Sequence, residues 1–294
     1  MDYVARAITM DGFVRIYAAN TTELVNEAAK IHGCSATAAA ALGRTLTATA
    51  MIGAMIKDEE TSVTVQIDGG GSIGKICAVT DGSAYVRGYC TNPMADLPTK
   101  ANGHLDVGGI VGTDGHLGII KDYGMKEPYM GHVNLVSGEI AEDFTKYFAE
   151  SEQTPSAVGL GVLVDKDLSI KSAGGYIIQL LPGATEEHIE DIEKSLAAFG
   201  SVTEAIEKGM TPEQIAESLM SDHSMFFYDN VDTGYFCPCS EERMERALIA
   251  IGKKDLQEII ETDGHAELKC HFCRRSFDFN KERLVEILNR ASEI

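Results

Sequence analysis

Two closely spaced pairs of cysteines lie in the last 58 residues of the chain. Cys237 and Cys239 have one residue between them, Cys270 and Cys273 have two, and thirty residues separate the pairs. Four thiolates are a complete ligand set for a tetrahedral structural zinc ion. The spacing departs from that of common zinc ribbons, because the first pair is short and the gap is long. The number and type of ligands nevertheless predict one Zn²⁺ per chain, bound by Cys237, Cys239, Cys270 and Cys273.

The energetics of so small a segment also favour a metal. Residues 237–294 contain few large apolar side chains, and a module of this size gains only about 3–5 kcal/mol from its own core. Structural zinc contributes on the order of 10–16 kcal/mol in small modules. We therefore expect this part to be folded with zinc and largely unfolded without it. His223, His265 and His271 are further possible ligands, but the four cysteines already complete the shell.

Oxidation of these cysteines has a predictable effect. Neighbouring thiols favour disulfides within each pair, Cys237–Cys239 and Cys270–Cys273. Loop closure for rings this small contributes only about 1.5–2 kcal/mol each, and neither bridge spans the thirty residues that a metal would span. Two local disulfides therefore do not replace one metal, and oxidation should release the ion and unfold the tail. On chemistry alone, an inert structural zinc site is the other interpretation.

The other three cysteines, Cys34, Cys77 and Cys90, lie in apolar runs and are expected to be small buried hydrophobic residues. The chain begins without the basic and then apolar segment of a secretory signal. Residues 36–56 are apolar, but Arg44 and several threonines make them too polar to span a membrane. We expect a soluble, cytoplasmic protein whose cysteines do not form structural disulfides.

Short elements must hold the two cysteine pairs together. Ser240 can cap a helix, and a second helix ends at Asp263-Gly264. Residues 265–270 and 274–279 have the pattern of two short strands around the second pair, and a last helix follows Asn280. The inward-facing positions of the three helices are Met244, Ala247, Leu248, Ile251, Leu256, Ile259, Ile260, Leu284, Ile287 and Leu288.

Residues 183–232 are strongly acidic, with 12 acidic side chains, 2 basic ones and a net charge of −10. Apolar residues at helical spacing predict short amphipathic helices, one of which begins at Thr211-Pro212. One interpretation is an ordinary helical subdomain packed on the first domain. The other is a linker that folds only while something holds it, because its charge is high and its apolar area modest. The apolar positions are Ile189, Ile192, Leu196, Phe199, Ile206, Met210, Ile215, Leu219 and Met220.

Residues 1–182 have the pattern of a mixed α/β domain. A capping-box pattern at Asn20–Glu23 begins a helix that Gly33 ends, and Ser35 begins a long buried helix over 36–56. Residues 69–74 contain Gly-x-Gly-x-x-Gly, but a strand-like run follows, so we expect a turn and no nucleotide site. The expected strands are 63–67, 75–79 and 84–90 (these two joined by an Asp-Gly hairpin turn), 117–121, 131–136, 159–164 and 176–181.

The predicted organisation is an α+β fold in three parts. These are an N-terminal mixed α/β core domain (1–182), an acidic helical linker (183–232) and a small C-terminal zinc-binding, redox-switch domain (233–294). The whole chain has 25 basic and 45 acidic residues, a net charge of −20. This charge argues against nucleic acid and anionic membranes as partners. Half of it lies in the linker, where self-repulsion lowers the cost of unfolding.

Over essentially its whole length the chain resembles the redox-regulated holdase chaperones known as thirty-three-kilodalton heat-shock proteins. The combination of Cys-x-Cys and Cys-x-x-Cys carries the resemblance specifically, whereas the glycine motifs alone would be weak. Ser72 is one departure, since proline is common there in the family's glycine turn, and it touches no site. The matching segments are 237–240 (CPCS), 270–273 (CHFC), 252–256 (GKKDL), 41–45 (ALGRT), 155–159 (PSAVG) and 173–176 (AGGY).

The resemblance implies an ATP-independent chaperone rather than an enzyme. In the family the four cysteines bind zinc, and the reduced, zinc-bound protein is inactive. Oxidation links the cysteines as neighbours, which here gives Cys237–Cys239 and Cys270–Cys273. Zinc then leaves, the tail and the linker lose structure, and apolar surface binds unfolding client proteins. Oxidised members of the family form homodimers.

Other functions match only parts of the sequence. A thiol–disulfide oxidoreductase also uses Cys-x-x-Cys, but at a helix N-terminus, whereas Cys273 leads into a strand-like run. A zinc-ribbon-like protein that binds nucleic acid needs a basic surface, whereas residues 237–294 have 10 basic and 12 acidic side chains. A catalytic zinc needs an open coordination position, which four thiolates do not leave.

Overall fold

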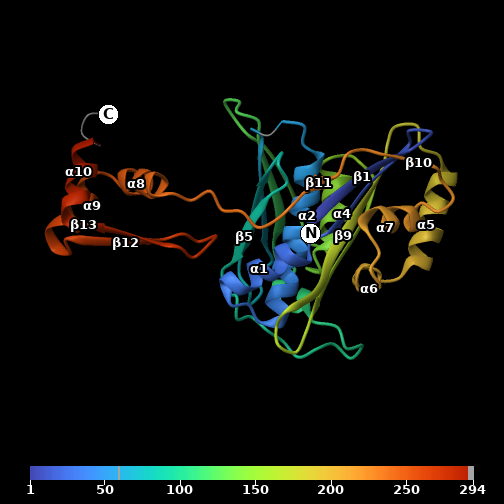
Figure 1. The fold of residues 1–294 in the computed structure, drawn as a ribbon, viewed down its shortest axis with the longest axis horizontal. Coiled ribbons are helices and arrows are strands. Elements are labelled where there is room, and N and C mark those ends of the chain that lie inside the picture. Colours follow the sequence, from blue (N-terminus) through green and yellow to red (C-terminus); the bar gives the residue numbers. More distant parts are fainter. Residues whose placement is uncertain (59, 291–294) are drawn as a thin grey trace. The chain divides into compact units, whose positions relative to one another are not determined.

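The computed structural model describes residues 1–58 and 60–290, and the chain divides into two compact units. The first unit is Met1–Phe236, and the second begins at Cys237. Helices and antiparallel sheets make up both units, so the predicted α+β class is confirmed (Figure 1). The functional boundaries at residues 182 and 232 stay a prediction.

Two antiparallel sheets form the framework of the first unit. One has six strands in the order β10-β1-β2-β9-β8 with β11 also paired to β1, and the other has five in the order β5-β4-β3-β6-β7. Every strand predicted in this unit is present, and β1, β2, β10 and β11 are additional. The strands are β1 (Tyr3–Thr9), β2 (Val14–Asn20), β3 (Ser62–Asp68), β4 (Ile76–Asp81), β5 (Val86–Cys90), β6 (His116–Asp122), β7 (Tyr129–Asn134), β8 (Ser156–Val164), β9 (Ile170–Leu180), β10 (Met225–Phe227) and β11 (Val231–Asp232).

Helix α2 (Ala36–Met55) is the centre of the larger apolar core. It contacts β8 and β9 of one sheet and β4 and β5 of the other, so almost every residue of the helix is buried. This double contact explains why the helix is apolar on all sides, as predicted for a core helix. Its N-cap is Ser35, whose side chain accepts a hydrogen bond from the amide of Ala38, also as predicted. Three more helices complete this core: α1 (Thr22–His32), α3 (Val107–Val111) and α4 (Ala141–Glu150).

The predicted capping box of α1 is wrong. Thr21 is the N-cap, but it is fully buried, and its hydroxyl forms a 2.7 Å hydrogen bond with that of Thr47 instead of capping the helix. The carboxylate of Asp2, from the start of the chain, accepts a 2.7 Å hydrogen bond from the amide of Leu24 and takes over the capping role. The helix ends at Gly33 in the left-handed conformation, as predicted.

The glycine-rich segment 69–74 is the turn between antiparallel strands β3 and β4, as predicted. Its backbone packs directly on the end of α3. The amide of Gly71 donates to the carbonyl of Val111 over 2.9 Å, and a Cβ at Gly71 would lie 2.2 Å from the carbonyl oxygen of Ile110. The glycine is therefore required by this close approach and not by a ligand.

Three helices from the acidic segment cover the face of the six-stranded sheet that is turned away from α2. They are α5 (Glu186–Phe199), α6 (Val202–Glu207) and α7 (Pro212–Leu219), drawn in gold in Figure 1. The start of α7 is as predicted, because Thr211 caps it and Pro212 is its first residue. A second apolar core joins these helices to the sheet, and it is separate from the core around α2. Its buried members are Ala7, Val14, Ile16, Ala18, Ile178, Ile192, Val202, Ala205, Ile215, Ala216, Leu219 and Met220.

The second unit is a small module of three helices and one hairpin, as the sequence predicts. Its elements are α8 (Glu241–Ala250), α9 (Lys253–Thr262), β12 (His265–Lys269), β13 (Ser276–Asn280) and α10 (Lys281–Arg290). Ile251, expected to face inward, is 45% exposed because α8 has already ended there. Among its described residues, the buried apolar core has six members: Leu248, Leu256, Ile260, Phe279, Leu284 and Ile287.

Candidate metal centre

Two short backbone segments present the four cysteines. Cys237 and Cys239 lie in extended chain just before α8, whose first turn is capped by the side chain of Ser240. Cys270 and Cys273 lie in the turn between β12 and β13. In that turn the amide of Cys270 donates to the carbonyl of Arg275, and the amide of Arg274 donates to that of Cys270, each over 2.9 Å. The turn thus directs both of its thiols to one side.

The four sulfur atoms form one cluster. Cys237 Sγ lies 3.7 Å from Cys270 Sγ, Cys239 Sγ lies 3.2 Å from Cys273 Sγ, and all four lie within 4.8 Å of one another. Tetrahedral zinc with bonds of about 2.3 Å separates its sulfur ligands by about 3.8 Å. The thiols of both pairs therefore fit a single zinc ion. None of the four cysteines forms a disulfide bond, so this arrangement is the reduced one.

Burial and the neighbouring thiols change the acidity of these cysteines. Burial raises the pKa of Cys237, and it raises the pKa of Cys239 to about 11. At Cys273 burial acts in the same direction, but hydrogen bonds from the amide of Arg275 and from neighbouring thiols outweigh it and lower the pKa. Four thiolates in contact repel one another, and a bound divalent cation is what allows all four to be ionised together.

Among the residues that the structure describes, no histidine belongs to the cluster. His265 lies 3.4 Å from the carboxylate of Asp278, and His223 lies 3.3 Å from that of Asp191. Cys34, Cys77 and Cys90 are buried in the first unit, as predicted. The Cys-x-x-Cys pair lies in a turn between strands and not at a helix N-terminus, where thiol–disulfide oxidoreductases place it.

A buried charge cluster in the second unit was missed by sequence reasoning. Glu245 on α8 is 4% exposed, and its two carboxylate oxygens accept hydrogen bonds from Arg283 and Arg290 of α10, the latter over 2.6 Å. These contacts fix α8 on α10 and so hold the segment that follows the first cysteine pair. The available signal was the position of Glu245, one residue after Met244 and three before Leu248 on the apolar side of α8.

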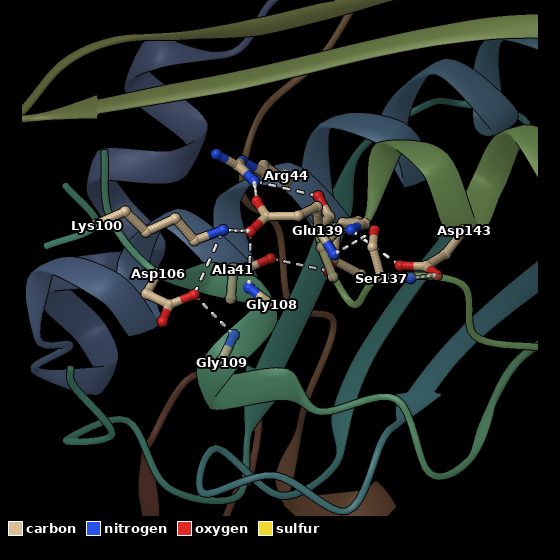
Figure 2. Close-up of polar contacts among 11 residues, drawn as sticks. Ala41, Arg44, Lys100, Asp106, Gly108, Gly109, Ser137, Glu139 and Asp143 are labelled. Carbon is tan, nitrogen blue, oxygen red and sulfur yellow. Dashed lines mark hydrogen bonds and ion pairs between the residues drawn. The ribbon is translucent and has the colours of Figure 1, made fainter. Parts of the chain in front are cut away.

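A second charge cluster lies in the first unit, around Glu139 (Figure 2). Arg44 of α2 donates to a carboxylate oxygen of Glu139 over 2.7 Å, and Lys100 and the amide of Gly108 donate to the other. Burial acts to raise the pKa of Glu139, but the hydrogen bonds from Lys100 and Arg44 outweigh it and lower the pKa. Lys100 also lies 3.4 Å from the carboxylate of Asp106, so the cluster is balanced in charge. It ties α2 to the two loops that cover it, and Arg44 therefore has a structural role.

The comparisons with known proteins agree with this geometry. Residues 2–280 match the family model described as Hsp33 protein. The chain belongs to the Hsp33 family. It is 50% identical over 287 residues to the "33 kDa chaperonin" of Clostridium botulinum strain 657, covering 98% of this chain and 97% of the relative. It is 47% identical over 292 residues to that of Bacillus velezensis, covering 99% of this chain and 100% of the relative.

A solved Hsp33 structure has the same fold. The crystal structure of the 33 kDa chaperonin from Thermotoga maritima superposes with a TM-score of 0.91 at 33% sequence identity, covering 99% of each chain. The chain is therefore a non-enzymatic chaperone with a C-terminal four-cysteine cluster consistent with a metal site. No described helix is both long and apolar enough to cross a membrane.

Proposed function

We propose that the protein is an ATP-independent holdase whose activity is controlled by oxidation of the four-cysteine cluster. The observation that carries this proposal is the meeting of two cysteine pairs, from separate parts of the second unit, within 4.8 Å. Cys237, Cys239, Cys270 and Cys273 would hold one zinc ion in the reduced, inactive protein. Bound zinc would supply a structural cross-link between the extended segment and the hairpin.

The activating step is oxidation of thiols to disulfides within each pair. As thiolates, Cys237 and Cys239 give up two electrons and form one S–S bond, and Cys270 and Cys273 do the same. Hydrogen peroxide accepts the two electrons of each pair, its O–O bond breaks, and two protons from the solvent complete two water molecules. The disulfides leave no thiolates to hold the metal ion, and neither bridge joins the extended segment to the hairpin.

Loss of this cross-link should unfold the second unit, since the apolar core among its described residues is small. The neighbouring segment 183–232 carries a net charge of −10 and is expected to follow. Its release would uncover the apolar sheet face beneath α5 to α7, including Val14, Ile16 and Ile178. An uncovered apolar face of this kind binds unfolding proteins and keeps them from aggregating.

Family membership supports unfolding or misfolded proteins as the clients. We further propose that the oxidised protein is a homodimer and acts in the cytoplasm, as the resemblance implies. Neither nucleic acid nor membranes are expected partners, because the chain carries a net charge of −20.

The proposal is tested by measuring metal release and chaperone activity on one sample. The reduced protein, loaded with zinc, is treated with hydrogen peroxide under mild heat, and free zinc and the light scattering of an aggregating test protein are followed together. We expect about one zinc per chain to be released as aggregation becomes suppressed. Release of zinc without suppression would refute the holdase assignment and leave the metal site intact.

Two cysteine variants sharpen this experiment. Cys239→Ser removes one ligand and should give weak zinc binding and loss of peroxide control. Cys77→Ala, at a buried cysteine outside the cluster, should keep both properties. Equal effects of the two variants would show that control does not reside in the cluster.

A further inference from the structure

The outer edge of β1 is covered by a segment from the far end of the first unit. Residues 225–236, here named the strap, follow the acidic helices and end immediately before Cys237. Strand β10 pairs antiparallel with Ala7, Ile8 and Thr9, and β11 pairs antiparallel with Tyr3 and Val4. Both are short, with three and two residues. The strap therefore adds two short pairings to the edge of a sheet whose other strands come from the preceding part of the chain.

The same strap also covers an edge of the other sheet. The hydroxyl of Thr233 donates to the carbonyl of Ala84 over 2.6 Å, and the amide of Val86 on β5 donates to the carbonyl of Gly234 over 2.9 Å. The amide of Phe236 then donates to the carbonyl of Val86 over 3.0 Å. One strap thus occupies hydrogen-bonding groups that edge strands β1 and β5 would otherwise expose.

Side-chain burial holds the strap only in part, since Thr233 is buried and Val231 and Tyr235 pack against the core around α2. Phe226, Tyr228 and Phe236 are 53%, 49% and 57% exposed, although aromatic side chains are normally well buried. Inward-facing Met225 and Phe227 pack only partly against the core beneath the acidic helices. The strap therefore depends largely on its backbone hydrogen bonds to β1 and β5, and the chain continues directly from it into the second unit.

We propose that release of the strap turns the outer edge of β1 into the binding site for an extended segment of an unfolding protein. This inference rests on the proposed function and names the site and the mode of capture. The client strand would take the place of β10 and β11 and form antiparallel backbone hydrogen bonds with β1. The chemistry of the occupant follows from the strap itself, which is extended peptide whose Met225 and Phe227 side chains pack against one face of the sheet.

The backbone geometry identifies the groups that would bind. The carbonyl of Arg6 accepts from the amide of Tyr228, and the amide of Met10 donates to the carbonyl of Ser224, each over 2.9 Å. Ile8 lies between them opposite Phe226, so its amide and carbonyl also point to the strap and not to β2. A site of this kind binds the backbone and the apolar side chains of an extended segment, and unfolding polypeptides expose both.

A matched pair of proline variants in the full-length protein tests the inference. Ile8→Pro removes an outward amide of β1, and Phe226→Pro removes the strap amide opposite it, so both weaken the same native contact. Only Ile8→Pro damages the proposed client site. After peroxide oxidation, binding of permanently unfolded, carboxymethylated α-lactalbumin should weaken at least tenfold in Ile8→Pro and stay equal or tighten in Phe226→Pro. Equal affinities in the two variants would overturn the inference.

Amide hydrogen exchange of the wild-type protein provides a test that does not depend on how the variants fold. The amides of Val4, Ile8 and Met10 should lose protection on oxidation and regain it when the unfolded chain is added. The edge would be refuted as a client site if protection of these amides persisted on oxidation or failed to return when the client is added. It would also be refuted if protection returned without the client, through a second copy of the protein. If oxidised wild-type protein binds no unfolded chain at all, the proposed function fails too, whereas tight binding with an unprotected β1 edge refutes only this inference.

Discussion

Replacement of Ile215 by alanine should loosen the acidic helices without removing the metal centre. Ile215 on α7 is fully buried in the core that joins α5 to α7 to the six-stranded sheet. Truncation of a buried isoleucine to alanine costs about 2–5 kcal/mol. A cost of about 3 kcal/mol multiplies the population with released helices by about 150. The milder Ile215→Val, at about 1 kcal/mol, should raise it about fivefold.

Amide hydrogen exchange of the reduced, zinc-loaded protein measures this population directly. Exchange in α5 to α7 and in the strap should accelerate by these factors, while amides of β3 and β6 keep their protection. Ile119→Ala is the matched control, because Ile119 is an equally buried isoleucine in the other core of the same unit. That variant should accelerate exchange throughout the two sheets.

Identical exchange patterns in the two alanine variants would refute the reasoning. They would mean that the two apolar cores unfold as one, so that the acidic helices could not be released alone. Unchanged exchange in Ile215→Ala would show instead that the packing of α7 does not hold the segment. In the expected case, the alanine variant should also suppress aggregation at a lower peroxide dose than the wild type.

Three further predictions concern the contacts that hold each part. Glu245→Gln weakens the contacts to Arg283 and Arg290 and should destabilise the second unit by about 1–3 kcal/mol. The loss should be seen as faster amide exchange in α8 and α10 and as earlier zinc release. Glu258→Gln, at an exposed position of α9, should have no effect. Removal of zinc by a strong chelator under reducing conditions should abolish protection in α8 to α10 while that in β3 and β6 persists; a tail that stays protected would refute the requirement for metal. Asp11 accepts a hydrogen bond from the hydroxyl of Thr9 and lies 3.0 Å from the ring nitrogen of His188 on α5. These hydrogen bonds lower the pKa of the Asp11 carboxyl. Its contribution to stability is therefore present above about pH 4 and is lost as the pH falls through its folded pKa. Asp11→Asn should therefore speed exchange at the start of α5 about two- to fivefold at pH 7, and equal exchange in variant and wild type at pH 7 would contradict this assignment.

The cysteine cluster could be predicted from the sequence because ligand type and spacing along the chain nearly determine it. Local patterns also predict strands with alternating burial, such as β3, and the turn at 69–74. The cap of α1 could not, because its acceptor is Asp2, twenty-two residues from the amide of Leu24 that it binds. Thr21 is diverted from capping by a tertiary contact with Thr47.

The strap was missed for a related reason. Residues 225–236 combine a short aromatic run with polar residues and have no regular alternation. Two short parts of the strap, β10 and β11, are strands because they pair with the edge of β1, more than two hundred residues earlier in the chain. The buried Glu245 is similar, since its two arginine partners are supplied by the last helix. Such features depend on which segments meet, and one local pattern does not specify both partners.

The six-stranded sheet separates two apolar cores, one on each face. Because the core around α2 includes no residue of α5 to α7, the proposed opening of the other face would leave one side of the sheet packed. After reduction, the strap and the acidic helices would then refold onto a sheet that is already folded, and the strap remains covalently attached near the β1 edge that it binds. A tethered segment acts at an effective concentration on the order of millimolar, far above that of a free client. Return of the strap would therefore displace the bound chain by competition, and client release would need no nucleotide hydrolysis.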